Sequence, residues 1–253
     1  MRLRILLLLL SVSCILGFVR LGIWQIDRAD YKEDLLAHAR QVLVERKADV
    51  LAAAADAPAP DSEADAYEWA AGSGHFLPLP VIRLDNQVRN GIPGIRVYRV
   101  FQPDGARHAV LVELGWRPLP SHLDMPAEPA PPAITQVHGL LSPPPVPGIS
   151  LGGSAIQRQP DGSLLLIRLD PDKLAPELKL AKGLAPRVLR LDPSMRVGYK
   201  RDLAVLSGTL PPEQHRGYAV QWFGMAIALL VTTIVVMRRK PQRKTDPNEE
   251  SAG

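Results

Sequence analysis

The stretch that decides the fold is Met225-Ala226-Ile227-Ala228-Leu229-Leu230-Val231-Thr232-Thr233-Ile234-Val235-Val236, which contains no charged residue. The apolar character extends from about Tyr218 to Met237. At a rise of ~1.5 Å per residue, a helix of that length covers the hydrocarbon core of a bilayer. A basic cluster follows at once, beginning with Arg238. Because basic residues favour the cytoplasmic side, we predict a transmembrane helix at 218–237 and a basic cytoplasmic tail at 238–253.

A second apolar run lies at the N-terminus, where Arg2 and Arg4 precede a leucine-rich core that continues to Val19. A cleaved signal peptide is one interpretation, but no small-x-small cleavage site follows the core. A lipoprotein signal ending at Cys14 is another, although Ser11 stands where a leucine-like residue is expected. The presence of a second span favours an uncleaved anchor, so we predict an N-terminal transmembrane helix at 1–20.

The two spans together predict the topology. Basic residues before the first span and after the second place both termini in the cytoplasm and residues 21–217 outside. The expected location is the inner membrane of a bacterium, with a periplasmic central domain. A mitochondrial protein would instead expose this domain to the intermembrane space. Aromatic residues agree, because Trp24, Tyr218, Trp222 and Phe223 all fall at the outer interface.

Composition narrows the function classes. The net charge is +4, but the densest basic cluster is the tail beyond the second span, so no nucleic-acid partner is expected. The only cysteine is Cys14, which excludes a disulfide within the chain. The central domain must therefore be stabilised by its own apolar core.

The central domain is expected to begin with a helix over about 24–55, continue through an acidic loop at 61–65, and become β-rich over about 75–210. The strongest strand pattern is Ala109–Trp116. Short runs between Gly and Pro turns predict a mainly antiparallel sheet or partly open barrel, and hence an α+β membrane protein. The other expected elements are strands at 76–84, 95–101, 134–141, 163–169, 187–191 and 203–207, and one short helix within 170–180.

One string suggests enzyme chemistry. Gly148-Ile149-Ser150-Leu151-Gly152 matches the nucleophile elbow of hydrolases, which requires a strand before the serine and a helix after it. Prolines precede this string and glycines follow it, so a serine hydrolase at Ser150 is only a remote alternative. No catalytic residue is predicted, and we do not expect an enzyme.

Two other features could form a site at the outer interface. His215 lies three residues before Tyr218, where an imidazole could ligate a haem iron that enters from the bilayer, or could be an ordinary interfacial side chain. Gln25, Arg28 and Lys32 are expected to share a helix face. That face is either solvated or holds a partner or the anionic edge of a cofactor.

Motifs in the sequence follow the order found in one known family. The first is Leu21-Gly22-Ile23-Trp24-Gln25-Ile26-Asp27-Arg28-Ala29-Asp30-Tyr31-Lys32, and the last is His215-Arg216-Gly217-Tyr218-Ala219-Val220-Gln221-Trp222-Phe223. Between them lie Leu84-Asp85-Asn86-Gln87, then Gly91-x-Pro93-Gly94, and then Val110 to Pro118. This pattern resembles the surfeit-locus (Shy-type) family of cytochrome c oxidase assembly proteins. Leu114 departs from it, because the family usually has arginine there.

The resemblance implies an assembly factor for haem-copper cytochrome c oxidase that assists insertion of haem a into subunit I. It makes His215 the expected ligand of the haem iron. The expected partners are oxidase subunit I, the haem a synthesis machinery and the lipid bilayer. A membrane scaffold that docks oxidase subunits without binding haem is the alternative. The residues expected around the haem, or in the contact between the helices, are Trp24, Gln25, Arg28, Tyr218, Gln221 and Trp222.

Overall fold

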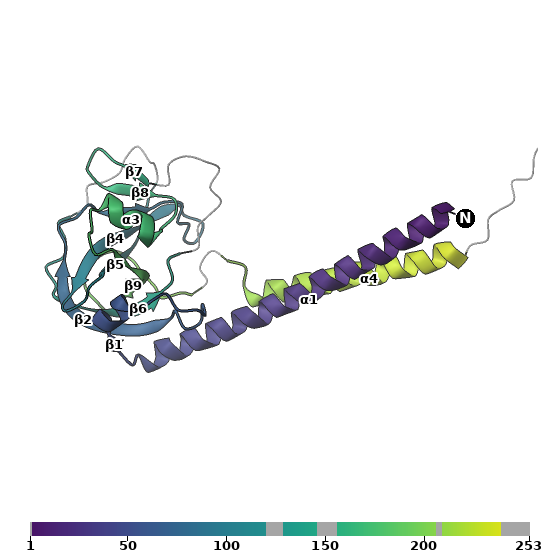
Figure 1. The fold of residues 1–253 in the computed structure, drawn as a ribbon, viewed down its shortest axis with the longest axis horizontal. Helices are drawn as coiled ribbons and strands as arrows, with labels where there is room; N and C mark the ends of the chain where they lie inside the picture. The colour runs from purple at the N-terminus through teal and green to yellow at the C-terminus, as the bar shows by residue number, and fades with distance from the viewer. Residues whose placement is uncertain (1, 120–128, 146–155, 206–208, 239–253) are drawn as a thin grey trace, which may run out of the picture. The chain divides into compact units, whose positions relative to one another are not determined.

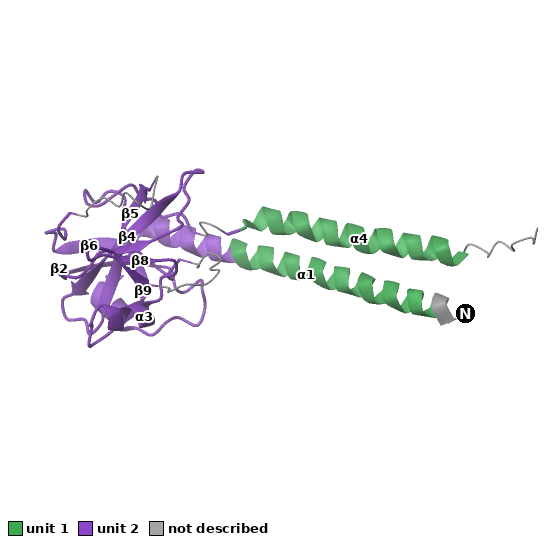
Figure 2. Ribbon diagram, turned by 90° about the horizontal axis from the view of Figure 1, so that it is seen from above, with its two compact units in different colours: residues 1–33, 210–253 green, residues 34–209 purple. Residues whose placement is uncertain are grey.

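The computed structural model describes residues 2–119, 129–145, 156–205 and 209–238. The chain divides into two compact units, one formed by residues 1–33 with 210–253 and the other by residues 34–209 (Figure 2). The string around Ser150 and most of the basic tail lie outside the described residues. We call residues 1–33 and 210–253 the helical unit and residues 34–209 the β unit.

Two long helices form the helical unit: α1 (Arg2–Glu45), whose last part belongs to the β unit, and α4 (Pro212–Arg238). Both helices are long and apolar enough to cross a membrane. Within this unit they lie side by side along much of their length (Figures 1 and 2). The sequence-based prediction of an apolar helix at each end is therefore confirmed.

The helix α1 ends earlier than the sequence indicates. We expected helix to about residue 55, but Arg46 takes a positive φ of 46° and donates its backbone N–H to the Val42 carbonyl at 2.9 Å. A residue in the left-handed region commonly ends a helix in this way. A two-residue strand, β1 (Asp49–Val50), and a short helix, α2 (Leu51–Asp56), follow. The apolar side of α2 is buried in the core of the β unit.

A closed five-stranded barrel forms the centre of the β unit. Its strands occur in the spatial order β2-β6-β9-β5-β4, and pairing of β2 with β4 closes the ring (Figure 1). The barrel and its additional strands confirm the expected β-rich fold, although β5 and β9 pair in parallel. The five strands are β2 (Glu68–Phe76), β4 (Gly94–Pro103), β5 (Ala109–Pro118), β6 (Gln136–Ser142) and β9 (Leu184–Leu191).

Alternating residues of the barrel strands supply two cores. Val110, Val112 and Leu114 of β5 belong to one core with Leu51 of α2, whereas Leu111 belongs to the second. This second core is covered by short elements that extend the sheet beyond β4. They are the strands β3 (Ile82–Leu84), β8 (Leu164–Leu166) and β7 (Ile156–Arg158). The helix α3 (Pro171–Glu177) also packs on this core.

A third core joins the end of α1 to the barrel. Leu35 and Ala39 of α1 are fully buried against Trp69 of β2 and Leu140 of β6. Two expectations differ from the structure here. The strand β2 begins at Glu68, well before residue 75, and residues 203–205 are not strand. The remainder of the strand expected at 203–207 lies outside the described residues.

Candidate functional site

The packing of α1 against α4 relies on small residues within the helical unit. Gly22, Ala29, Ala219 and Ala226 are buried there. A Cβ added to Gly22 would lie 2.7 Å from the nearest ring carbons of Phe223, closer than atoms pack. Small residues let two helix backbones approach closely, and this approach brings polar side chains at the same level into contact.

His215 and Gln25 meet at that level. The His215 side chain is buried, with 6% of the residue exposed, and its Nδ1 lies 2.6 Å from the Gln25 Oε1. An amide oxygen can only accept a hydrogen bond, so with this amide orientation Nδ1 carries the proton and donates it. The lone pair of the imidazole is then on Nε2.

The Nε2 atom of His215 is the unusual feature of this contact. It is shielded from solvent and has no hydrogen-bond partner among the residues that the structure describes. Leaving such an atom without a partner is costly, because its desolvation is not compensated. A histidine that binds a metal through one nitrogen typically donates the other N–H to an oxygen. The His215–Gln25 pair has this arrangement, so a haem iron bound here would be held through the His215 Nε2.

Charged residues surround the pair. Lys32 is buried, with 5% exposed, and its Nζ donates a hydrogen bond to the Leu210 carbonyl. Arg216 forms ion pairs with Glu33 at 2.7 Å and with Asp30 at 3.4 Å, which link α4 to α1. Sequence reasoning did not find these ion pairs, because no pattern in either helix indicates which of its charges will face the other.

The remaining residues of the expected site lie nearer the surface of the helical unit. Trp222 is half-buried, with its ring centroid 5.7 Å from that of Phe18. Arg28 is exposed and stacks over the ring of Tyr31 at 4.9 Å. Trp24, Tyr218 and Gln221 are also exposed. The structure thus joins His215 to Gln25 directly and leaves four of the expected residues facing outward.

Most of the chain, including residues of both helices, matches a family of known proteins. The model of the SURF1 family matches residues 12–227, which include part of α1, the β unit and part of α4. The chain belongs to the SURF1 family. This membership implies a role in cytochrome oxidase assembly at the level of the family. No curated protein matches the chain.

The three central motifs of this SURF1-family chain meet in the β unit. The Trp116 indole donates a hydrogen bond to the Gln87 carbonyl at 2.7 Å, and a Cβ added to Gly94 would lie 2.5 Å from the Trp116 ring. Gly115 has a φ of +122°, with Tyr199 directly behind it. Leu114, at the position where an arginine was expected, is buried in the barrel core. These contacts give the motifs a structural role.

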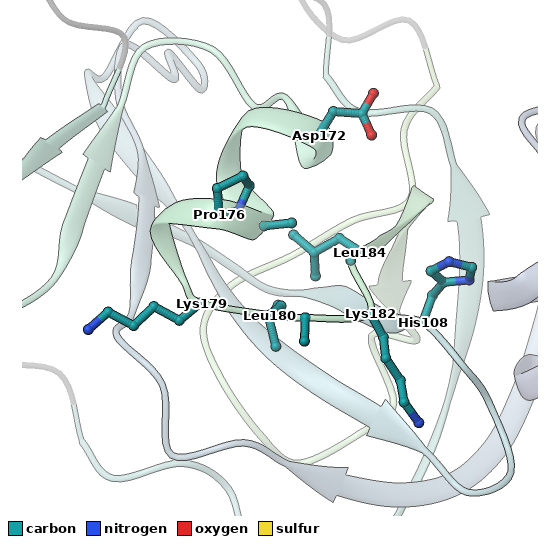
Figure 3. A pocket seen from close by; sticks show the side chains of 10 residues that line it. His108, Asp172, Pro176, Lys179, Leu180, Lys182 and Leu184 are labelled. Carbon is teal, nitrogen blue, oxygen red and sulfur yellow. The ribbon is translucent and has the colours of Figure 1, made fainter.

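A hollow of about 720 Å³ lies beside α3 and the start of β9. Its lining includes His108, Asp172, Lys179 and Lys182. Figure 3 shows that these side chains point away from one another. In the described part of the chain, no group of three or more His, Cys, Asp or Glu residues could hold a metal ion. Polar groups therefore do not converge on this hollow as they do in a catalytic site.

Proposed function

We propose that this SURF1-family chain assists assembly of a haem-copper cytochrome c oxidase by holding haem a at His215 and passing it to subunit I. The observation that supports the proposal is the buried His215 Nε2, for which the described residues provide no hydrogen-bond partner, while Nδ1 donates to the Gln25 Oε1. A bound haem would supply an iron atom with a coordination position that the His215 Nε2 would fill. We propose no turnover chemistry for the chain.

The surrounding residues favour this role in two ways. Gln25 fixes the tautomer of His215, so that the lone pair stays on Nε2. Lys32 and Arg28 place positive charge near the imidazole, where the carboxylates of a haem would be attracted. Because Nε2 is shielded from solvent, ligation requires the neighbouring side chains to move apart at this level.

The proposed topology places both termini in the cytoplasm and the β unit in the periplasm of a bacterium. Arg238, at the end of α4, supports this orientation, because basic residues are retained on the cytoplasmic side. Subunit I and the haem a synthesis machinery are the proposed partners, and both would meet the chain in the membrane.

The visible spectrum of the detergent-purified protein, co-expressed with a haem a biosynthesis pathway, tests the haem proposal. We expect a Soret band that is lost in His215→Ala and reduced in Gln25→Ala. Without the Gln25 amide, the imidazole proton is no longer held on Nδ1 and can move to Nε2, the nitrogen that would bind the iron. His75→Ala is the matched control, since His75 is an exposed histidine of the β unit. Unchanged haem content in His215→Ala would remove His215 from the site. A colourless protein that still co-purifies with subunit I would replace the proposal with a docking scaffold.

A further inference from the structure

A small pocket in the β unit is lined by an unusual set of charges. Its volume is about 70 Å³, and it lies where the turn before β4 meets strand β5 and the segment that follows β9. Arg89, Arg96 and Arg201 line it together with Glu113 and Asp202. The lysine-lined hollow beside α3 differs, because its charged side chains diverge (Figure 3).

Positive charge exceeds negative charge around this pocket. Arg190 does not line the pocket, but its Nε lies 3.6 Å from the Glu113 Oε2 and its Nη2 lies 3.8 Å from the Asp202 Oδ1. Asp192 is a further acidic neighbour of Arg201, and it is also paired with Arg46 at 2.8 Å. With these two residues included, five guanidinium groups face three carboxylates among the described residues, which leaves an excess of two positive charges. Arg190 and Glu113 are almost fully buried, so solvent screens this excess less than it would at an exposed surface.

Arg201 accounts for part of the excess. In the described residues its guanidinium donates only to backbone carbonyls, among them those of Asp192 and Leu114. Partial burial lowers the pKa of Arg201, and the nearby carboxylates of Asp192 and Glu113 oppose this shift without cancelling it. The carbonyls satisfy its hydrogen bonds, but they do not neutralise its charge.

The other arginines retain hydrogen-bond donors. Among the described residues, Arg96 reaches Glu113 through Nη1 alone, at 3.2 Å, and Arg89 pairs with Asp202 through Nη2. The Nε of Arg190 is buried and has no hydrogen-bond partner in the described part of the chain. A guanidinium group that has two free N–H groups on one edge can donate two parallel hydrogen bonds to two oxygens of a carboxylate or phosphate.

We propose that this pocket binds one small oxyanion, a carboxylate or a phosphate group, between Arg89 and Arg96. A water molecule needs roughly 10–15 Å³ of such volume, so the pocket has room for an anion of a few heavy atoms. The anion would neutralise part of the excess charge of the cluster. It can be a free ion, or the acidic side chain of a protein that docks there. Nothing in this proposal depends on haem binding at His215.

Binding is tested by calorimetric titration of the full-length protein in detergent, with inorganic phosphate and with acetate, at constant ionic strength set by chloride. Arg89→Gln removes one positive charge from the lining, and we expect binding about tenfold weaker. Asp202→Asn removes a competing carboxylate, and we expect tighter binding. Lys182→Gln is the matched control, because it removes a cation that lies outside this pocket.

The outcomes separate the possible sources of the anion. Saturable binding of phosphate or acetate with this order of affinities supports a site for a free anion. Binding only of a short peptide rich in Asp, with the same dependence on Arg89, supports docking of an acidic protein segment. The proposal is overturned if no probe binds, or if Arg89→Gln and Lys182→Gln behave alike. The fold of each variant is checked by its thermal unfolding, so a loss of binding is not mistaken for unfolding.

Discussion

His215 and Gln25 are separated by 190 residues in the sequence, and their contact illustrates what a sequence can predict for a single residue. The position of His215 one turn before an apolar span was sufficient to make it a candidate ligand. Its hydrogen bond was not predictable, because it depends on the rotation of each helix about its own axis. That rotation is set by the close packing of Gly22 and Phe223, which no periodicity reveals.

Gly115 is a residue at which we expect a substitution to strain the backbone strongly. Its φ of +122° is accessible only to glycine, and a Cβ would lie 2.7 Å from the Tyr199 carbonyl oxygen. We expect Gly115→Ala to lower the free energy of unfolding by about 2–4 kcal/mol, as measured by denaturant titration. Gly105→Ala is the control, because Gly105 also has a positive φ but a Cβ there would meet no atom within 4 Å. Equal losses in the two variants would show that the Tyr199 contact contributes nothing.

The lowered pKa of Asp56 leads us to expect that the stability of the protein falls at acidic pH. Its carboxylate accepts backbone hydrogen bonds from Arg107 and His108, which lower its pKa from the ordinary value of 3.8. A lowered folded-state pKa stabilises the protein above the unfolded-state value, and this contribution is lost as pH falls through the folded-state value. The wild-type unfolding temperature should therefore fall more steeply below about pH 4 than that of Asp56→Asn. Parallel curves for the two proteins would contradict this assignment.

The sequence predicted the strands that carry alternating large apolar residues, but it did not predict most of β2, which lacks them. Residues Ala109 to Trp116 lie in β5 as expected, because large apolar residues fill both cores there. The strand β2 was missed because its centre is rich in glycine, alanine and serine. Its small residues have a tertiary reason, since a Cβ at Gly72 would lie 2.8 Å from the Leu51 Cβ of α2. A constraint of this kind is visible only after the helix has been placed.

The helix pair offers a test of the packing between elements. Gly22→Ala places a methyl group against the Phe223 ring, so we expect lower thermal stability in detergent. Phe223→Ala should relieve that clash, and the double variant should lose less stability than the two single variants together. Gly17→Ala is the control on the same helix, because a Cβ there meets no atom within 4 Å. Strict additivity of the Gly22 and Phe223 effects would mean that these residues do not touch.

For the whole molecule, composition and hydropathy were sufficient to predict two apolar helices around a β-rich domain. They could not predict that the sheet closes, because closure depends on a pairing between β2 and β4, the first and last strands of the row β2-β6-β9-β5-β4. A partly open barrel was the nearest expectation. The short helix at α3 was also expected, and it lies within the predicted residues 170–180.

The proposed orientation gives a prediction for the full chain. A reporter protein that is active only in the cytoplasm, fused after Gly253, should be active, because the basic residues that follow α4 hold the tail inside. The same reporter inserted after Gly105, in a turn of the β unit, should be inactive and serves as the control. The opposite pair of activities would reverse the topology.

The barrel is closed by very few paired residues. The β2–β4 pairing has three positions, from Gly74 to Phe76, whereas β4 and β5 pair at eight. Pro103, one of the three partners on β4, has no N–H to contribute. Separation of these two strands breaks fewer paired positions than separation of any other neighbouring pair in the barrel, so we expect the ring to open first at this junction without global unfolding. In deuterated water, amides along this junction should exchange their hydrogens well before those of β5, and transient opening there would give solvent its first access to the barrel interior.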